Sequence, residues 1–448
     1  MSHIMQRLAD YVVGARGQKL SDDLRNAACC NVLDLIAATI PGVHAPGPRA
    51  FRQAAGAFFG GGEIPVWFCG QSFGLAGAIA CNASAAAALD LDDGHRIARG
   101  HPGAAVIPAA FAAAQQARIS TEELLNAIVV GYEVGVAVGA ARRFYANTGM
   151  WSGYGVVAAL GVLRNVGPEA LAHAFAIAGV SAPNQLHAGA GPVFSAQEGS
   201  DVKEGIPWSS VTALHALLLA EAGHTGPLAL LDNEEHFRAE QIADNLGTHG
   251  YVARNYKKFH ACCRHAHAPV EALLSVLTKH DIDATEIEAI KVATYSGALR
   301  LANRPRPLGF TDIQFSIPYC LALVAFDAAQ ALLPLTEAAV DRPKIVALAE
   351  KVSLTLDPDI DARFPAETLS RVTVIARDQQ FVSEIVAPRG EASAPPSWPD
   401  LEEKLRQASR FVASHAEQTK IIESLRRLRD GDHEPLFEIL AAIDFSRM

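Results

Sequence analysis

The sequence predicts a mainly α-helical protein with a large all-α domain and a smaller α+β domain. Apolar residues recur every three to four positions through most of residues 1–268, as on the buried face of a helix. Apolar and polar residues then alternate in four short segments, which is typical of half-buried strands. A Pro- and Ser-rich linker follows, and then a helical tail. We therefore expect residues 1–268 and 399–448 to form the all-α domain and residues 269–398 to form the α+β domain.

The all-α part begins with helical spacing over residues 4–41, in which Ser21 is a suitable N-cap for the second helix. Glycines at 60–62 and Pro65 mark a loop. Four further helices are expected at residues 121–141, 155–166, 168–178 and 209–222. No convincing run of alternating strand residues occurs before about residue 268, so this part should be nearly all α.

The α+β part contains the four strand-like segments, at residues 286–295, 351–356, 369–377 and 380–386. The last two should form a hairpin around Asp378 and Gln379. Helical stretches near residues 313–329 and 337–348 lie between the first two strands, which favours an α+β arrangement. The tail at 400–441 is charged on one face, so we expect it to pack back on the large domain.

Composition excludes several classes of function. The formal net charge is −10, whereas a nucleic-acid surface needs clustered Lys and Arg, so no nucleic-acid partner is expected. The first residues lack the pattern of a signal peptide, and the most apolar run, at 75–91, is shorter than the roughly 20 residues of a membrane span. The seven cysteines form neither a disulfide framework nor a zinc motif. We expect a cytoplasmic protein with no membrane partner.

The most unusual stretch is residues 76–108, where an alanine-rich helix runs into a charged cluster. Its charged residues are Asp90, Asp92, Asp93, His95, Arg96, Arg99 and His101. Acidic residues at the C-terminal end of a helix oppose the helix dipole, so stability alone does not explain three of them. His101 precedes Pro102, a favoured first residue of a helix, and a helix N-terminus favours a neutral, basic imidazole.

This cluster has three interpretations. A metal site is one, because carboxylates bind hard cations and histidines bind transition metals. However, no HxH, HExxH or CxxC pattern accompanies the cluster, and Arg96 and Arg99 would compete for the carboxylates. A structural network of ion pairs is the second interpretation. We favour the third, a substrate site without a metal.

A second basic cluster lies at residues 257–271. Arg264, His265 and His267 precede the helix expected from Pro269. Helix N-termini bind anions and arginine binds carboxylates through two hydrogen bonds, so this cluster is predicted to bind a carboxylate; solvated surface histidines are the alternative. Cys262 and Cys263 adjoin it, but no flanking feature marks either as a nucleophile.

Two single residues are weaker candidates. Lys203 lies between a glycine-rich segment at 189–199 and a helix, and Tyr145 follows the helix over 121–141. Neither a dinucleotide-binding glycine pattern with its acidic partner nor a phosphate-binding GxxxxGK[ST] loop is present, so no nucleotide cofactor is expected. The absence of GxSxG likewise gives no support to a serine hydrolase.

Several of these segments together resemble the MmgE/PrpD family. They are the Asp90–Asp93 run with the segment from His101 to Pro108, the segment from Lys258 to His267, Lys203, and the segment from Gln314 to Tyr319. The likeness covers nearly the whole chain. It implies a large all-α domain, a smaller α+β lid resembling chorismate mutase, a cleft between them, a homodimer, and neither a metal nor an organic cofactor. It also implies a small polycarboxylate substrate and a site formed by Asp90, His101, Lys203 and Tyr319, with Arg264 and His267.

Two departures from the family pattern bear on the reaction. Gly94 stands where the family often has threonine, and residues 151–154 lack a histidine that it often has. Dehydratase and decarboxylase activities are associated with those side chains. The resemblance therefore points to the family's epimerase. We expect a cofactor-independent isomerase that interconverts stereoisomers of an N-substituted aspartate, iminodisuccinate.

An epimerase needs a base and an acid on opposite faces of the α-carbon. We assign Lys203 and Tyr145 to that pair, with His101, oriented by Asp90 or Asp93, as the alternative base. The residues expected to bind the substrate are Asp93, Arg99, Arg264, His267 and Tyr319. The alternative function is a lyase like 2-methylcitrate dehydratase, acting on a tricarboxylic or dicarboxylic acid, with Lys203 or His101 as base. A dicarboxylate-binding protein without catalytic activity is a third possibility.

Overall fold

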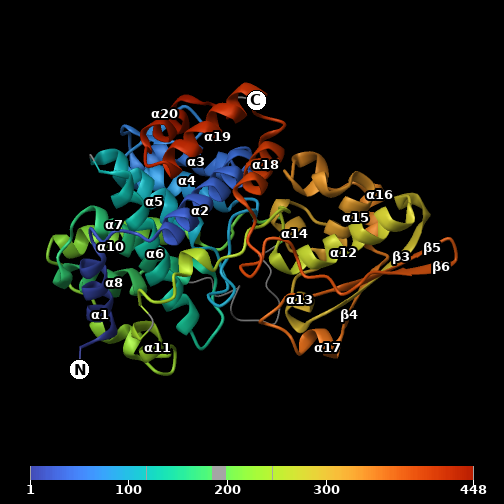
Figure 1. Ribbon diagram of the computed structural model, residues 1–448, viewed down its shortest axis with the longest axis horizontal. Coiled ribbons are helices and arrows are strands. Elements are labelled where there is room, and N and C mark those ends of the chain that lie inside the picture. Colours follow the sequence, from blue (N-terminus) through green and yellow to red (C-terminus); the bar gives the residue numbers. More distant parts are fainter. Residues whose placement is uncertain (1, 118, 184–197, 245, 447–448) are drawn as a thin grey trace.

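The structure is a computed structural model, which describes residues 2–117, 119–183, 198–244 and 246–446 and is mostly helical (Figure 1). The helices before residue 254 are α1 (Ile4–Ala15), α2 (Asp22–Gly42), α3 (Pro46–Phe59), α4 (Leu75–Ala87), α5 (Gly103–Gln116), α6 (Thr121–Ala141), α7 (Ser152–Leu163), α8 (Pro168–Val180), α10 (Ile206–Glu221) and α11 (Ala239–Ala243). Short 3-10 turns are η1 (Thr148–Met150), η2 (Leu228–Asp232) and η3 (Tyr251–Ala253). The expectation of a mainly α protein is confirmed.

Helix α6 shows how local sequence sets an element in this part. Ser120 accepts a hydrogen bond from the backbone N–H of Glu123, whose carboxylate accepts one from the N–H of Ser120 in return. This capping box satisfies N–H groups that a helix start leaves free. Helix α6 has the length and hydropathy of a membrane span, but it is buried within the protein, where it packs on α5 and α7.

A small hairpin is the exception in this part of the chain, which was expected to be nearly all α. Strands β1 (Ile64–Val66) and β2 (Gln71–Phe73) pair in antiparallel fashion. Three residues per strand are too few for an alternating pattern to stand out in the sequence. Phe68 and Gly70 have positive φ angles of 59° and 61° in the connection, which turns the chain back.

The other part of the chain combines helices with a four-stranded sheet. Its helices are α12 (Arg264–His280), α13 (Ser296–Leu299), α14 (Phe310–Gln314), α15 (Ile317–Asp327), α16 (Pro343–Ala349) and α17 (Pro358–Asp361), with 3-10 turns η4 (Ala284–Glu286), η5 (Ala329–Leu332) and η6 (Glu337–Ala339). The strands are β3 (Ile287–Thr294), β4 (Val352–Leu356), β5 (Arg371–Ala376) and β6 (Gln379–Val382). The order across the sheet is β4-β3-β5-β6, with only β3 and β4 parallel.

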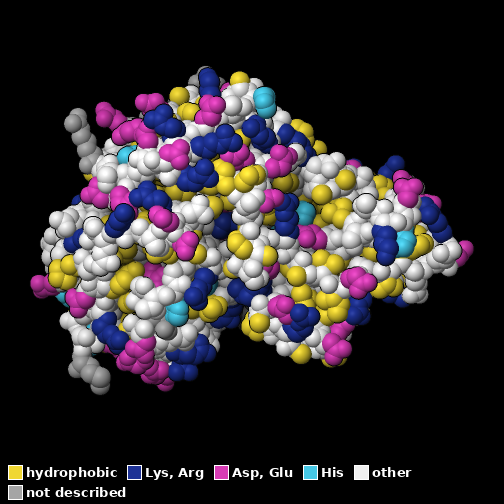
Figure 2. Space-filling view, viewed as in Figure 1, with side chains coloured by type: hydrophobic (Ala, Val, Ile, Leu, Met, Phe, Trp, Pro, Cys, Tyr) yellow, Lys and Arg dark blue, Asp and Glu magenta, His cyan; other side chains and the backbone are white. Residues whose placement is uncertain are grey.

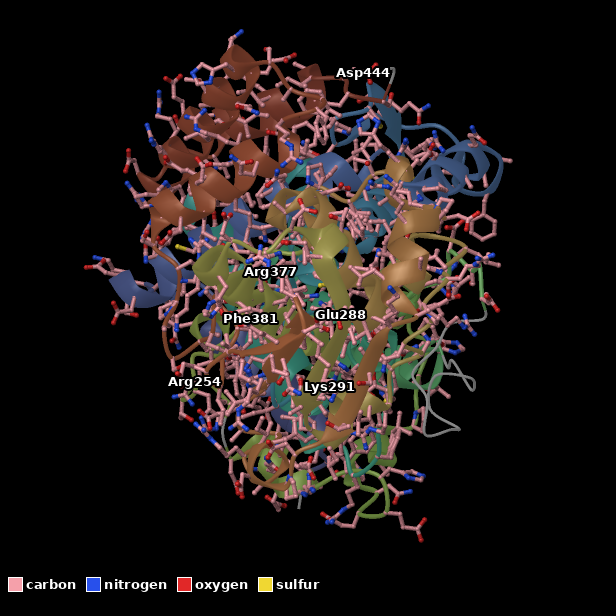
Figure 3. The ribbon with its side chains drawn as sticks, turned by 90° about the vertical axis from the view of Figure 1, so that its right-hand side faces the viewer. Arg254, Glu288, Lys291, Arg377, Phe381 and Asp444 are labelled. Atoms are coloured by element: carbon pink, nitrogen blue, oxygen red, sulfur yellow. The ribbon has the colours of Figure 1, made fainter. Side chains whose placement is uncertain are left out.

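The sheet confirms the predicted strands and their hairpin. Arg377 and Asp378 both have a φ of 55°, the left-handed conformation that a tight two-residue hairpin turn needs. A register shift between Ile287 and Ala289 breaks the alternation on β3. Figure 3 shows this side of the molecule, with Glu288 and Lys291 labelled. Both residues are exposed, although they are three positions apart and would point to opposite faces of a regular strand.

Two hydrophobic clusters divide the described residues. One draws on the helices before residue 254 and on the tail helices α18 (Trp398–Ser409), α19 (His415–Arg429) and α20 (Glu434–Ala442). The other consists mainly of residues 261–376. The tail returns to the large helical part, where α18 packs on α2 (Figure 1). Because Ala87 and Ala98 belong to the first cluster and Leu89 and Leu91 to the second, the charged stretch at 90–101 lies between the two.

A buried ion pair fixes α18 against α2. Lys404 Nζ lies 2.6 Å from Asp34 Oδ1 and donates to the carbonyl oxygen of Leu91 at 2.8 Å. Both side chains are fully buried. Burial raises the pKa of the Asp34 carboxyl and lowers the pKa of the Lys404 amine, although each charge opposes the shift of the other. The pair holds the C-terminal tail on the large helical part, and through Leu91 it contacts the charged stretch at 90–101.

The outer surface mixes both signs of charge. On the face shown in Figure 2, Lys and Arg side chains are interspersed with Asp and Glu. The domain boundaries given above, the homodimer, the lid and the cytoplasmic location stay predictions.

Candidate active site

The centre of the charged stretch is the carboxylate of Asp90. Helix α4 ends at Ala87, and Asp90 adopts a left-handed φ of 52°, which Asp tolerates better than most residues. This turn directs the carboxylate inward, and Asp90 is 2% exposed. Its Oδ1 atom contacts Lys258 Nζ, and lies 3.2 Å from Lys203 Nζ and 3.4 Å from His101 Nε2. Three groups that can carry positive charge therefore meet at one carboxylate oxygen.

Lys258 was not among the predicted site residues. It lies 168 residues beyond Asp90, in the connection before α12, and is fully buried. Its Nζ also donates to the carbonyl oxygen of Asp90 at 2.8 Å. Burial by itself would lower the pKa of this amine, but Asp90 and Asp92 outweigh burial and raise it. Lys258 begins the 258–267 segment that resembles the family, and this adjacency was the signal that could have singled it out.

Lys203 reaches Asp90 from the loop before α10. Its Nζ donates to the carbonyl oxygen of Ala87 at 2.9 Å, at the open end of α4, where a helix leaves carbonyls free. The side chain of Lys203 is 7% exposed and that of Lys258 is 0% exposed, so Lys203 is the more accessible of the two amines. Residues 189–197 of the glycine-rich segment before Lys203 lie outside the described residues.

His101 stands just before α5, as expected. Its Nδ1 lies 2.8 Å from the backbone carbonyl oxygen of Asp93, and its backbone N–H donates to Thr148 Oγ1. Since a carbonyl only accepts, Nδ1 carries a proton, and Nε2 is the atom that faces Asp90. The ring is thereby oriented by a backbone group rather than by the carboxylates of Asp90 or Asp93.

The three aspartates of the stretch have different surroundings. Asp93 accepts hydrogen bonds from Tyr132 Oη at 2.9 Å, from the N–H of Gly103 at 3.1 Å and from the Asn255 amide. These contacts fix the first turn of α5, which is a structural role rather than the substrate contact predicted for Asp93. Asp92 is fully buried, and neither of its oxygens has a hydrogen-bond partner among the described residues; its nearest ion partner is His101 Nδ1 at 3.5 Å.

The surrounding charges set the protonation state of Asp90. Burial by itself would raise the pKa of its carboxyl, but Lys203, Lys258 and His101 hold that pKa well below its usual range. Asp90 is therefore a carboxylate at neutral pH. The ligand atoms of Asp90, Asp92 and His101 lie within 4.8 Å of one another, as in a metal site. The two ammonium groups already at Asp90 would repel a cation there, in agreement with a site that binds anions.

Gly94 is explained by its neighbour Tyr256. A Cβ atom on Gly94 would lie 2.4 Å from both Cζ and Oη of Tyr256, and the backbones of the two residues pair with each other. A threonine at position 94 would collide with this ring. The phenol thus fills the space in which a threonine side chain would lie, and burial raises its pKa to about 12, so it stays protonated. The site keeps a hydroxyl group despite the glycine.

We predict that Gly94→Ala destabilises the fold by about 1–3 kcal/mol, because its added methyl group overpacks against Tyr256. Thermal unfolding of the two proteins measures the difference. Gly14→Ala is the matched control, since nothing lies within 4 Å of a Cβ at position 14, inside helix α1. A Gly94→Ala protein as stable as the control would contradict the close approach of Tyr256.

Three predicted substrate-binding residues lie in other surroundings. Arg264 donates hydrogen bonds to Glu391 Oε1 at 2.7 Å and to the carbonyl oxygens of residues 388 and 389, and its guanidinium stacks on the Tyr256 ring. Its guanidinium is therefore engaged in holding the linker that follows the sheet. His267 is fully buried in α12 and contacts the carbonyl oxygen of Cys262. Tyr319 is buried in the second hydrophobic cluster and donates its hydroxyl to the carbonyl oxygen of Ala339 at 2.6 Å. The described contacts give Tyr319 a packing role.

Tyr145 and Arg99 lie together at the edge of the stretch. The Arg99 guanidinium carbon is 5.7 Å from the centre of the Tyr145 ring, and Arg99 is exposed. Burial and the nearby Glu204 carboxylate raise the pKa of Tyr145 well above its usual range. This phenol can donate a proton or a hydrogen bond, but it is a poor base at neutral pH.

Relatives of this chain are known as decarboxylases. A cis-aconitate decarboxylase of Aspergillus terreus is 27% identical in an alignment 462 residues long, gaps included, that covers 94% of this chain and 92% of that protein. A second cis-aconitate decarboxylase of Aspergillus terreus is 26% identical, covering 98% of this chain and 96% of that protein. The cis-aconitate decarboxylase-like protein oryM of Aspergillus oryzae is 23% identical, covering 98% and 97%.

These relatives overturn the prediction of an isomerase. Decarboxylases are lyases, and none of the three names describes an epimerase. The prediction rested on the missing threonine at Gly94 and the missing histidine in residues 151–154. The structure weakens the first of these reasons, because Tyr256 brings a hydroxyl group to Gly94.

Family comparison agrees with the predicted resemblance. The MmgE/PrpD N-terminal domain matches residues 6–245, and the MmgE/PrpD C-terminal domain matches residues 260–430. Of the two matches, the first spans the stretch from Asp90 to His101 and Lys203. They leave between them the short connection in which Tyr256 and Lys258 lie. This chain belongs to the MmgE/PrpD family.

Proposed function

We propose that this protein is a lyase that acts on a small polycarboxylic acid, and that its reaction is the decarboxylation of an unsaturated tricarboxylate of the cis-aconitate type. One observation carries the proposal: the Asp90 carboxylate holds two ammonium groups and an imidazole in a buried cluster. The relatives support this choice of reaction, because two of them are named cis-aconitate decarboxylase and this chain matches them over nearly their whole length.

Binding of a polycarboxylate suits this distribution of charge. Lys203, Lys258 and His101 are three groups that can carry positive charge, against the two neighbouring carboxyl groups of Asp90 and Asp92. A site of low dielectric strengthens their attraction for an anion. The exposed Arg99 beside Tyr145 adds a further cation that can meet an outlying carboxylate.

Decarboxylation needs a proton donor rather than a redox group. The bond between the substrate carbon and its carboxylate breaks, CO₂ leaves, and the electron pair stays on the substrate. A proton then forms the new C–H bond, and the donor recovers its proton from water. Fixed positive charge near the remaining carboxylates stabilises the carbanion as it forms.

Lys203 and His101 are the best placed donors. Their side chains are 7% and 11% exposed, whereas Lys258 is closed off from solvent. Asp90 cannot donate, since its carboxyl has already lost its proton at neutral pH. We assign Asp90 to positioning the two amines, Lys258 to fixed positive charge, and Lys203 or His101 to proton transfer.

Dehydration of a hydroxy acid is the second candidate function. The observation that favours it is Asp92, a buried carboxyl group beside His101 with no hydrogen-bond donor among the described residues. A carboxyl group in that position can accept a hydrogen bond from the hydroxyl group of a substrate and hold that group in place. This reaction forms an unsaturated acid without releasing CO₂, so the two candidates have different products.

We expect Lys203→Met to lower the rate of decarboxylation by about 10²–10⁴-fold, as loss of a proton-transfer group does. The assay follows CO₂ release from cis-aconitate in D₂O and the incorporation of one deuterium into the product. Lys291→Met is the control, because Lys291 is exposed on β3, far in sequence from the cluster (Figure 3).

The outcomes separate the candidates. Release of CO₂ together with incorporation of one deuterium into the organic product supports the decarboxylase. Loss of water from a hydroxy tricarboxylate, with no CO₂ from any acid, supports the dehydratase instead. A Lys203→Met enzyme as active as Lys291→Met would contradict the role of Lys203 in either reaction.

A further inference from the structure

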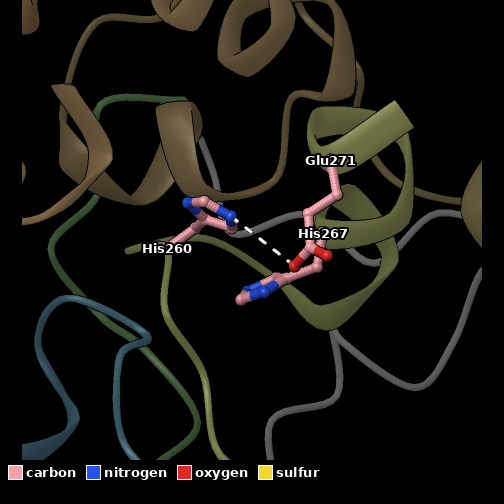
Figure 4. A group of neighbouring side chains, drawn as sticks. All are labelled: His260, His267 and Glu271. Carbon is pink, nitrogen blue, oxygen red and sulfur yellow. Dashed lines mark ion pairs between the residues drawn. The ribbon is translucent and has the colours of Figure 1, made fainter. Parts of the chain in front are cut away.

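A second cluster of metal-binding side chains lies away from Asp90. His260, His267 and Glu271 face one another where the connection before α12 meets that helix (Figure 4). One ligand atom from each lies within 4.8 Å of the other two. His260 and His267 are 6% and 0% exposed. None of the roles assigned above uses this group.

The hydrogen bonds of His267 leave one nitrogen ready to bind an ion. Its Nε2 lies 3.2 Å from the carbonyl oxygen of Cys262, so Nε2 carries the proton. Its Nδ1 is buried and has no hydrogen-bond partner among the described residues. A histidine that binds a metal commonly donates its other N–H to a backbone carbonyl in this way.

His260 and Glu271 are separated by a distance that suits a shared ion. His260 Nε2 is 3.8 Å from Glu271 Oε1, too far for a hydrogen bond (dashed line in Figure 4). Two ligands of one tetrahedral Zn²⁺, each about 2.0–2.1 Å from it, lie roughly 3.4 Å apart. Glu271 is itself held by the backbone N–H of Arg389, at 3.0 and 3.1 Å from its two oxygens.

The neighbouring positive charges are already paired. Arg264 lies 2.7 Å from Glu391, and Lys258 contacts Asp90. The side chain of Glu271 is 23% exposed, which gives an ion a route from solvent. Two imidazoles and one carboxylate are the ligand set that transition metals such as zinc prefer, with a fourth position left for water.

We propose that His260, His267 and Glu271 form a binding site for one divalent transition-metal ion. This goes against the expectation, drawn from the sequence, that the chain binds no metal. The bound ion joins the connection that carries Lys258, two residues before His260, to helix α12. Its effect is therefore to stabilise the segment that brings Lys258 to the active site.

The test titrates metal-stripped, full-length protein with Co²⁺ and then with Zn²⁺. We expect one equivalent of Co²⁺ to give visible d–d absorption bands, Zn²⁺ to displace it, and the melting temperature to rise with Zn²⁺. His260→Asn and Glu271→Gln should each weaken binding at least about tenfold. Both residues lie nearer the surface than His267, and circular dichroism shows whether each variant is folded.

His215→Ala is the matched control, since this histidine is exposed on α10. It should bind Co²⁺ as the unaltered protein does. The proposal fails if the protein gives no saturable Co²⁺ bands. It also fails if folded His260→Asn and Glu271→Gln proteins bind Co²⁺ as tightly as His215→Ala. These readouts do not depend on enzymatic activity, so they stand apart from the proposed decarboxylation.

Discussion

Asp90→Asn is expected to lower turnover by at least about 100-fold and to destabilise the fold by about 3–5 kcal/mol. The amide keeps the shape of the side chain but removes the charge that Lys203, Lys258 and His101 share. Lys258 is fully buried, so its ammonium would lose its closest counter-charge where water cannot replace it. The measurements are the decarboxylation rate and the free energy of unfolding by urea.

Asp281→Asn is the matched control for this substitution. Asp281 has a left-handed φ of 50°, close to the 52° of Asp90, but it is exposed at the end of α12. The effect of asparagine on a left-handed backbone is therefore common to both variants, and only the buried charge differs. Equal stability and activity in the two variants would contradict the central role of Asp90.

The same substitution should change the response to acid. Because the pKa of Asp90 is lower in the folded protein than the usual value of about 3.9, its ionisation stabilises the fold above that pH. This contribution is lost as the pH falls below about 4. The stability difference between the unaltered protein and Asp90→Asn should accordingly be largest at neutral pH and shrink below pH 4 in urea unfolding experiments.

Lys404→Met is expected to cost about 3–5 kcal/mol of folding stability. It leaves Asp34 buried without its cation and the carbonyl oxygen of Leu91 without its donor. Burial already raises the pKa of the Asp34 carboxyl, so the lone carboxyl should take up a proton on folding. Thermal unfolding should therefore show a smaller loss at pH 5 than at pH 8.

The double variant Asp34→Leu with Lys404→Met supplies the comparison. Removing both charges leaves neither member of this ion pair buried without the other, and such replacements are often neutral or stabilising. It should recover most of the stability that Lys404→Met loses. If the double variant were no more stable than the single one, packing of the Lys404 side chain rather than its charge would be what holds α18 on α2.

Local signals in the sequence predicted most of the secondary structure. The strands β5 and β6 and their hairpin follow from alternation, although the turn lies at Arg377 and Asp378, one residue before the expected Asp378 and Gln379; α6 begins at the capping box of Ser120. Each of these signals involves residues within a few positions of one another. The hairpin β1–β2 was missed because its strands are too short to show a period.

The sequence by itself determined that this protein is mainly helical, that it resembles the MmgE/PrpD family, and that an anomalous charged stretch leads from Asp90 to His101. Only the tertiary structure decided which side chains meet there. It brought Lys258 to Asp90, committed Asp93 to the first turn of α5, and placed Tyr256 over Gly94. The physical reason is that hydrophobic period and capping are properties of neighbouring residues, whereas the partner of a buried charge is set by how distant segments pack.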